Sequence, residues 1–207
     1  LKFPQWYDRF HLFGYDVTAA PRLFERIWVG TETRNPDTPR YGYVMPTEGY
    51  INFRWLSSLG KGKTAGAWYD FGDCTPDLYR MQAFQSVLAG ARELVLFEAG
   101  SLIDKNPCLD GLLPRRDALY ALGLILDTRV PMGIQAYKPP HSDGSDPDGA
   151  ANLYVYDYLA ALGLAPLPVS QIPARPACVF LPRQAAADPD ILPRISALLD
   201  TGASVIL

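Results

Sequence analysis

The fold class is decided by residues 64–98, which read TAGAWYDFGDCTPDLYRMQAFQSVLAGARELVLFE. The runs 64–70 and 93–98 at its two ends are apolar and rich in residues that favour β-strands. Between them, apolar residues recur at helical spacing, and Thr75 followed by Pro76 is typical of a helix start. A strand, a helix and a second strand in this order indicate two parallel strands joined by a right-handed crossover.

The same alternation extends toward the N-terminus. Residues 26–32 form a third β-prone run, which ends in an acidic residue like the runs 64–70 and 93–98. Residues 18–26 and 49–59 are weaker helical stretches before and after it. The pattern predicts an α/β fold with parallel strands. Polar residues at the carboxyl ends of such strands are typical of a (β/α)8 TIM barrel, whose active site gathers at that edge.

Residues 114–207 differ in composition from residues 1–113. All four tryptophans lie in the first part, whereas the second is rich in Leu, Ala and Pro, and such a shift predicts a domain boundary. Strands and helices alternate again in the second part, but no strand ends in an acidic residue, so we expect an open, doubly wound sheet. The expected strands are 130–137, 166–169, 177–181 and 203–207, and the expected helices are 148–162 and 190–201.

The run 203–207 has the apolar composition of a strand buried in a parallel sheet. Such a strand needs neighbours on both sides and helices over both faces of the sheet. We therefore expect the native polypeptide to continue beyond Leu207, so that the 207 residues are a fragment of a longer protein.

The amino-acid composition excludes several classes of protein and several kinds of binding partner. The chain is 48% hydrophobic and 20% charged with a formal net charge of -3, which excludes a disordered tail, and no block of Lys and Arg indicates nucleic-acid binding. No apolar run approaches the ~20 residues that span a bilayer, so we expect a soluble chain without a membrane partner. The three cysteines lack CxxC spacing, the two histidines lack metal-ligand spacing, and no Gly-rich phosphate loop occurs. We therefore expect no metal and no cofactor, while the cellular location stays open.

Residues 68–70, 75–83 and 88–97 resemble the last two strands of bacterial glycoside-hydrolase barrels. The likeness is closest to the β-galactosidase relatives that carry a class I glutamine-amidotransferase-like domain behind the barrel. In those enzymes the helix between the last strands ends in a small Gly-Ala turn, before a final strand that finishes in an aromatic residue. Residues 90–91 and Phe97 match these two features.

Residues 154–163 and 188–207 look like the opening of that second, flavodoxin-like domain. The resemblance implies that residues 1–113 are the last strand–helix units of a TIM-barrel glycosidase-like domain. It also implies that residues 114–207 begin the glutamine-amidotransferase-like domain. Because Cys178 lacks the glycine-flanked strand–turn–helix elbow of an amidotransferase nucleophile, we expect the second part to be a structural or oligomerising module, which would allow a homo-oligomer.

Glycoside hydrolysis needs two carboxyl groups, one protonated to assist the leaving group and one ionised to attack or to activate water. Glu32, Asp70 and Glu98 each follow one of the three strands of the first part, and closure of a barrel would bring these strand ends to one rim. The resemblance places Asp70 where the family carries its nucleophilic glutamate, at the end of the seventh strand. It places the acid/base glutamate on a fourth strand, outside this sequence. We predict Glu32 and Asp70 to be catalytic.

Polar and aromatic residues near the same strand ends are candidates for binding a carbohydrate substrate. Sugar hydroxyls take charge-assisted hydrogen bonds, and sugar C–H faces stack on aromatic rings. The candidates are Arg34, Tyr43, Trp68, Tyr69, Asp73 and Glu98. Acidic residues at strand ends also cap helices and pair with arginines, so the alternative to a glycoside hydrolase is a non-catalytic carbohydrate-binding or scaffold protein that keeps the barrel. A small free-standing α/β domain with an unrelated role is a weaker third interpretation.

Overall fold

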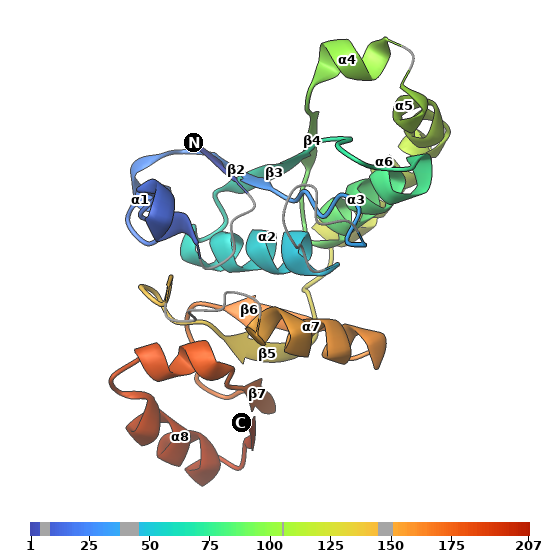
Figure 1. Ribbon diagram of the computed structural model, residues 1–207. Coiled ribbons are helices and arrows are strands. Elements are labelled where there is room, and N and C mark those ends of the chain that lie inside the picture. The colour runs from blue at the N-terminus through green and yellow to red at the C-terminus, as the bar shows by residue number, and fades with distance from the viewer. Residues whose placement is uncertain (5–8, 38–45, 105, 145–150) are drawn as a thin grey trace.

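The described part of the chain forms two parallel β-sheets with helices around them (Figure 1). The computed structural model describes residues 1–4, 9–37, 46–104, 106–144 and 151–207. The first sheet has the order β1 (Lys2–Phe3), β2 (Ile27–Gly30), β3 (Thr64–Tyr69), β4 (Glu93–Leu96). The second has the order β6 (Pro166–Val169), β5 (Ile134–Tyr137), β7 (Cys178–Phe180), β8 (Ser204–Ile206). All strand pairs are parallel, which confirms the predicted α/β class.

Helices connect the strands, and the best-predicted one is α3 (Pro76–Leu88). Thr75 is its N-cap, and the Thr75 hydroxyl oxygen accepts a hydrogen bond from the Leu78 amide at 3.3 Å. The other helices of the first part are α1 (Ala20–Leu23), α2 (Glu48–Leu59), α4 (Ala99–Ile103) and α5 (Pro107–Leu112). The second part has α6 (Arg116–Asp127), α7 (Ala151–Ala161) and α8 (Ile191–Asp200). Short 3-10 helices are η1 (Phe10–Phe13), η2 (Leu113–Arg115) and η3 (Arg183–Ala187).

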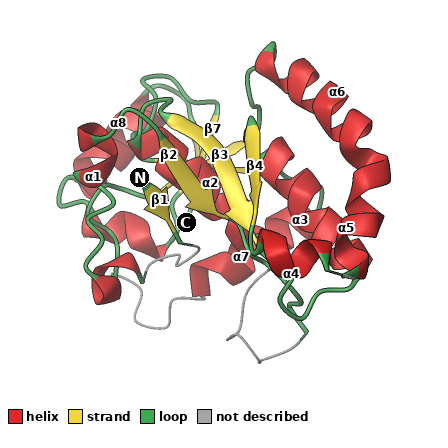
Figure 2. Cartoon of the chain, turned by 90° about the horizontal axis from the view of Figure 1, so that it is seen from above, coloured by secondary structure: helices red, strands yellow, loops and turns green. Residues whose placement is uncertain are grey.

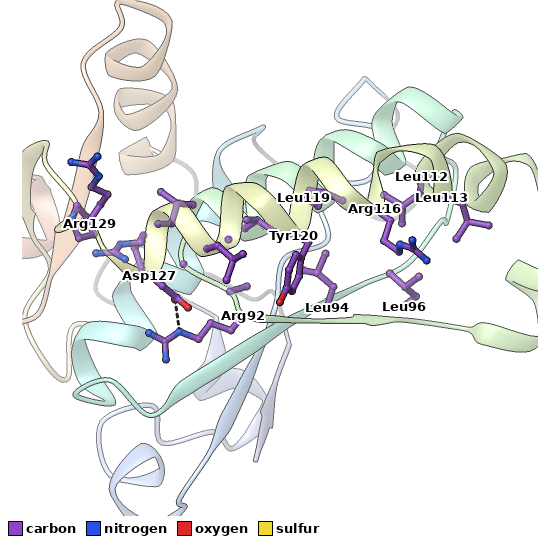
Figure 3. Close-up of a pocket in the computed structure, with 18 residues that line it drawn as sticks. Arg92, Leu94, Leu96, Leu112, Leu113, Arg116, Leu119, Tyr120, Asp127 and Arg129 are labelled. Carbon is purple, nitrogen blue, oxygen red and sulfur yellow. Dashed lines mark ion pairs between the residues drawn. The ribbon is translucent and has the colours of Figure 1, made fainter.

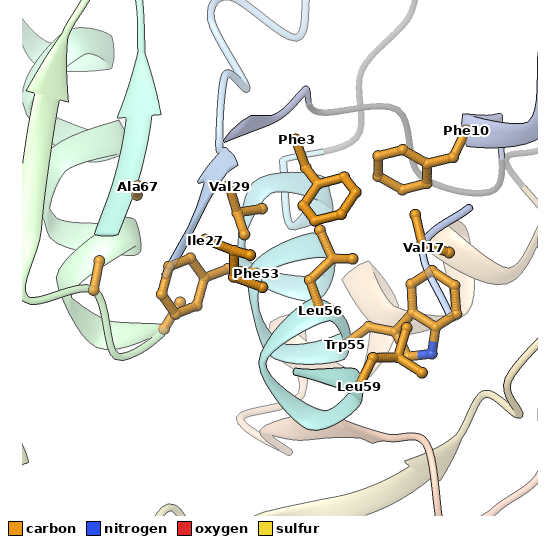
Figure 4. Close-up of a cluster of buried hydrophobic side chains, with 12 residues drawn as sticks. Phe3, Phe10, Val17, Ile27, Val29, Phe53, Trp55, Leu56, Leu59 and Ala67 are labelled. Atoms are coloured by element: carbon orange, nitrogen blue, oxygen red, sulfur yellow. The ribbon is translucent and has the colours of Figure 1, made fainter. Parts of the chain in front are cut away.

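The first sheet packs one of its faces against α2. Side chains alternate between the two faces of a strand, so Ile27, Val29 and Ala67 point toward this helix. There they meet Phe53 and Leu56 in a buried apolar cluster, which Figure 4 shows from the side. Removal of this apolar surface from water is the main force that holds α2 on the sheet.

A second apolar cluster lies around α3, α5 and α6, which gather beside β4 (Figure 2). Tyr69 of β3 and Tyr79 of α3 are buried in it together with Leu112 and Leu119. Helix α6 follows residue 113 in the sequence, yet it packs against α3 of the first part. The helical cover of the first sheet therefore continues past residue 113.

Helix α2 lies between the two sheets (Figure 1). One face of the helix contacts the first sheet, as described above. On the other face, Ile51 joins Ala136, Tyr156 and Phe180 of the second part in a third buried cluster. The two sheets therefore share α2 as a common layer.

Several features differ from the sequence-based expectations, among them the strand expected over 130–137, which begins only at Ile134. Strand β1 was not expected, because two residues carry no periodic signal. The helix expected over 18–26 is reduced to α1, which ends where Phe24 takes an extended backbone. The strand expected to be buried over 203–207 is β8, which within the described residues pairs with β7 on one side only and leaves Ile206 41% exposed.

Candidate active site

Three acidic residues follow the carboxyl ends of three neighbouring parallel strands. The register pairs Gly30 of β2 with Trp68 of β3, and the last residues of β3 with those of β4. Asp70 directly follows β3, and Glu32 and Glu98 lie two residues beyond the ends of β2 and β4. All three therefore lie at the same edge of the first sheet, as the sequence indicated.

Glu32 is the most buried of the three residues, with 3% of its surface exposed. Burial raises the pKa of its carboxyl group from 4.5 to about 8. A backbone hydrogen bond and the charge of Arg34 act against this shift, the negative charge of Asp70 adds to it, and Lys2 acts weakly against it. Glu32 therefore carries its proton at neutral pH, the state that a general acid needs.

Arg34 and Asp70 form a two-point ion pair across the ends of β2 and β3. Arg34 Nε donates to Asp70 Oδ1 at 2.8 Å, and Nη2 donates to Oδ2 at 2.7 Å. The Gly72 amide also donates to Asp70 Oδ1, at 3.0 Å. The two parallel hydrogen bonds fix the orientation of the Asp70 carboxylate, and the guanidinium also compensates its negative charge.

Gln82 of α3 ties the two strand ends together. Its Oε1 accepts a hydrogen bond from the Arg34 amide, and its Nε2 donates to the carbonyl oxygen of Asp70, both at 3.0 Å. One turn further along α3, Ser86 Oγ lies 2.7 Å from Thr31 Oγ1. Sequence reasoning missed Gln82, because only the packing of α3 shows that this polar side chain is buried.

Trp68 lies on the open face of the first sheet, away from α2. The Lys2 ammonium is 3.8 Å from the centroid of the Trp68 ring, and the Phe97 ring meets that ring edge-on at a centroid distance of 6.0 Å. The Trp68 indole also donates to the carbonyl oxygen of Phe3 at 2.8 Å. Lys2 and Phe97 were not among the predicted site residues. Lys2 escaped notice because β1 carries no signal, whereas an aromatic residue directly before Glu98 could have been noticed.

Tyr69 is not brought to this group of residues, contrary to expectation. It is fully buried beneath α3, with its ring centroid 5.1 Å from that of Tyr79. Consecutive residues of a strand point to opposite faces, so Trp68 and Tyr69 cannot face the same side. Tyr69 is therefore a core residue of the helix-covered face.

Three further candidates have separate surroundings. Glu98 is exposed at the N-cap of α4, and its Oε2 accepts a hydrogen bond from Ser101 Oγ at 3.2 Å. Asp73 is half-buried in the loop from β3 to α3, with a left-handed φ of 57°. Tyr43 lies outside the residues that the structure describes.

Cys74 lies in the same loop, close to Asp70. Its Sγ accepts a hydrogen bond from Gln82 Nε2 at 3.4 Å. Burial, with smaller contributions from Cys108 and Asp70, raises the pKa of the Cys74 thiol to about 12. Cys74 therefore stays a neutral thiol at physiological pH, and all three cysteines of the chain are free.

A cavity of about 540 Å³ lies elsewhere, between β4 and α6 (Figure 3). Leu94 lines it from the strand, Leu119 and Tyr120 line it from the helix, and the ion pair of Arg92 with Asp127 spans one end at 2.8 Å. This cavity is on the helix-covered side of β4, not at the carboxyl ends of the strands. It is therefore separate from the candidate active site.

The group at the strand ends combines a protonated carboxyl in Glu32, a carboxylate held by a guanidinium, and an aromatic face at Trp68 and Phe97. Such a set can transfer a proton and can bind a ligand rich in hydroxyl groups. Over the parts of the chain that the structure describes, no three His, Cys, Asp or Glu side chains are grouped so as to hold a metal ion. The helices described there are also too short or too polar to cross a bilayer.

Comparison with known proteins gives a family for the first part of the chain. Residues 1–111 match the family described as probable glycosyl hydrolase, catalytic domain. The chain is also 25% identical over 181 residues to an uncharacterized protein of Saccharolobus solfataricus, an alignment that covers 83% of this chain and 28% of that protein. The chain thus spans less than a third of the length of this relative. No solved structure matches this chain. Because the family match covers more than half of the chain, the protein belongs to the family of probable glycosyl hydrolase catalytic domains.

Proposed function

We propose that this chain forms part of a glycoside hydrolase that cleaves a carbohydrate with Glu32 and Asp70 as its carboxyl pair. The observation that carries the proposal is the buried carboxyl of Glu32, whose pKa is raised to about 8, at the carboxyl edge of a parallel sheet. A glycosidase needs one carboxyl group that is still protonated at the pH of the reaction. The family of residues 1–111 supports the same class of reaction.

In this proposal Glu32 gives its proton to the glycosidic oxygen as the bond to the anomeric carbon breaks. A water molecule then bonds to that carbon, and its released proton restores the acid form of Glu32. Asp70 supplies negative charge to the oxocarbenium-like transition state, and Arg34 fixes the direction of that carboxylate. Trp68 and Phe97 offer ring surface beside the reacting groups, and Asp73, Glu98 and Tyr43 remain proposed substrate contacts.

The proposed framework is the C-terminal part of a (β/α)8 TIM barrel followed by the start of a flavodoxin-like, glutamine-amidotransferase-like domain. The sequential order β1-β2-β3-β4 with parallel pairing supports the barrel. The order β6-β5-β7-β8 supports the second assignment, because flavodoxin-like sheets place their second strand outside the first and their third on the other side. We keep the proposed boundary between residues 1–113 and 114–207, with α6 as a helix of the second part that rests on the first.

The proposed partner is a carbohydrate substrate, and we propose no binding to nucleic acid or to a membrane. A homo-oligomer would form through the second part of the chain. The alternative is a carbohydrate-binding or scaffold protein without catalysis. The geometry of Asp70 favours this alternative in one respect, because Arg34 and Gly72 already use both of its carboxylate oxygens.

The two functions are separated by amide substitutions in the full-length protein. Glu32→Gln and Asp70→Asn keep the shape of each side chain and remove its acid–base chemistry. The matched control is Glu25→Gln, because Glu25 is exposed and precedes β2, at the opposite edge of the first sheet from the candidate site. We expect Glu32→Gln to lower turnover of a chromogenic glycoside by at least a hundredfold without lowering the melting temperature, while the control keeps its turnover. Wild-type turnover in both the Glu32 and the Asp70 variants would favour the non-catalytic alternative.

A further inference from the structure

The first turns of α2 hold the backbone that leads to Glu32. Asn52 Nδ2 donates to the carbonyl oxygens of Gly30, at 3.1 Å, and of Pro4, at 3.2 Å, at the ends of β2 and β1. Gly49 packs so closely on Thr31 that a Cβ atom at Gly49 would lie 2.7 Å from the Thr31 carbonyl oxygen. The position of α2 therefore sets the position of the segment that carries Glu32.

The opposite side of α2 is held by the second part of the chain at three points along its length. At the N-terminus of the helix, Asp157 of α7 accepts a hydrogen bond from the Thr47 amide at 3.0 Å through Oδ1. In the middle, the indole of Trp55 donates to the Lys138 carbonyl oxygen at 3.0 Å. At the C-terminal end, the amide of Ser170, which follows β6, donates to Ser58 Oγ at 2.8 Å.

The side chain of Lys138 adds a second interaction to the middle contact. Lys138 directly follows β5, is fully buried, and its Nζ lies 4.1 Å from the centroid of the Trp55 ring. The same Nζ donates to Ser142 Oγ at 3.0 Å. A buried ammonium is stable only where partners replace its water, and Trp55 is one of those partners. Lys138 and Trp55 therefore hold one another in place.

Asp157 makes the N-terminal contact specific. Thr47 is the N-cap residue of α2, and its own side chain makes no capping bond. A carboxylate at this place satisfies one of the amides that a helix start leaves without a partner and interacts favourably with the helix dipole. Because Gly49 and Asn52 lie within five residues of Thr47, this contact acts on the turns of α2 that touch the segment before Glu32.

We propose that Asp157 and Lys138 are positioning residues for Glu32, which act by fixing α2 against the ends of β1 and β2. The second part of the chain then supports the candidate active site from outside, although none of its described residues lies in that site. The consequence for catalysis rests on the proposed function, whereas the positioning itself does not.

Amide hydrogen exchange of the full-length protein tests this inference without any turnover. Two reporters flank Glu32: the Thr31 amide donates to the Trp68 carbonyl at 2.9 Å, and the Arg34 amide donates to Gln82 Oε1 at 3.0 Å. The reference is the Phe97 amide, which donates to the Tyr69 carbonyl at 3.0 Å at the far side of the sheet from α2.

The test variants are Asp157→Ala and Lys138→Met. The matched control is Tyr137→Phe, which removes the buried hydrogen bond of the Tyr137 hydroxyl to Asp188 at 2.8 Å in the same part of the chain without touching α2. We expect each test variant to speed exchange at Thr31 and Arg34 at least tenfold and at Phe97 less than threefold. The control should change none of the three amides by more than threefold, and Asp157→Asn, which keeps an oxygen acceptor, should restore slow exchange.

A purely structural role predicts a different result. Lower stability of the whole chain would speed hydrogen exchange at all three amides equally, and this outcome overturns the inference. Unchanged exchange rates at Thr31 and Arg34 also overturn it. As a second readout, the midpoint of the Glu32 carboxyl titration should move in both test variants, because the burial of Glu32 and its placement relative to Lys2, Arg34 and Asp70 would change. An unchanged midpoint also contradicts the inference. Inactivity toward glycosides would reject the proposed function and leave these exchange results intact.

Discussion

The guanidinium of Arg34 holds both carboxylate oxygens of Asp70, although the two residues follow different strands and are 36 positions apart. The backbone of Arg34 takes a left-handed φ of 47° to reach this geometry, a conformation that costs a non-glycine residue ~1 kcal/mol. The pair, with Gln82 behind it, therefore fixes the loops that follow β2 and β3 relative to each other.

Replacing Arg34 by lysine keeps the positive charge and removes the fork. We expect Arg34→Lys to lower the free energy of unfolding by ~1–2 kcal/mol, because a point charge cannot make two parallel hydrogen bonds to a half-buried carboxylate. Urea unfolding at pH 7 measures this loss. The control is Arg80→Lys, since the partner of Arg80 is Asp77, whose side chain is 80% exposed, and such surface pairs contribute less than ~1 kcal/mol. Equal losses in the two variants would contradict the prediction.

The raised pKa of Glu32 makes the stability of the chain depend on pH. Below pH 4.5 both the folded and the unfolded chain carry the proton, so burial of Glu32 has no electrostatic penalty. As the pH rises from 4.5 to about 8, the unfolded chain loses this proton while the folded chain keeps it, and stability falls by up to ~5 kcal/mol.

Glu32→Gln should abolish that fall, because the amide does not titrate. We expect the variant to be more stable than the wild type at pH 9 and to differ less from it at pH 4. Urea unfolding at pH 4, 7 and 9 gives the three differences. A constant difference between variant and wild type over this range would show that Glu32 does not titrate in the window given above.

Gly49 is required by the close approach of α2 to the end of β2. In Gly49→Ala the new Cβ would lie 2.7 Å from the Thr31 carbonyl oxygen, and backbone must move to relieve the contact. We expect a loss of ~2–3 kcal/mol in the free energy of unfolding. Gly123→Ala in α6 is the comparison, because a Cβ there meets nothing within 4 Å, and alanine should stabilise that helix by up to ~1 kcal/mol. Opposite signs for the two substitutions are the expected result of thermal or urea unfolding.

The N-cap residue of α3, Thr75, should contribute to the free energy of unfolding through its own hydrogen bond. Thr75→Ala removes the oxygen that accepts a hydrogen bond from the Leu78 amide and should cost ~1 kcal/mol. Thr75→Ser keeps the oxygen and should cost only a few tenths of that amount. Chemical denaturation of the three proteins checks the order, and an alanine variant as stable as the serine variant would refute the capping role.

Local sequence signals were enough for the elements with strong capping and apolar runs. Strands β3 and β4 and helix α3 lie where the stretch 64–98 placed them, because Thr75, Pro76 and the two β-prone runs act over a few residues. Three helices within residues 99–127 were not expected. Each of α4 and α5 is at most six residues long, too short for a periodic signal to stand out.

The candidate site was predictable to the extent that parallel strands bring their carboxyl ends to one edge. That rule brought Glu32, Asp70 and Glu98 to the same edge, whereas alternation along β3 put Tyr69 on the wrong face for it. Gln82 was missed because its contacts with Arg34 and Asp70 exist only once α3 has packed on the sheet.

The α/β class and the acidic strand ends can be predicted from local patterns, since they depend on residue propensities and on the period of apolar residues. Three other features appear only in the folded chain: α2 packs on both sheets, Lys138 is fully buried beside Trp55, and burial raises the pKa of Glu32. These features come from contacts between residues far apart in the chain, such as the 83 positions between Trp55 and Lys138. Burial and electrostatic environment arise from such contacts, and no local pattern of residues encodes them.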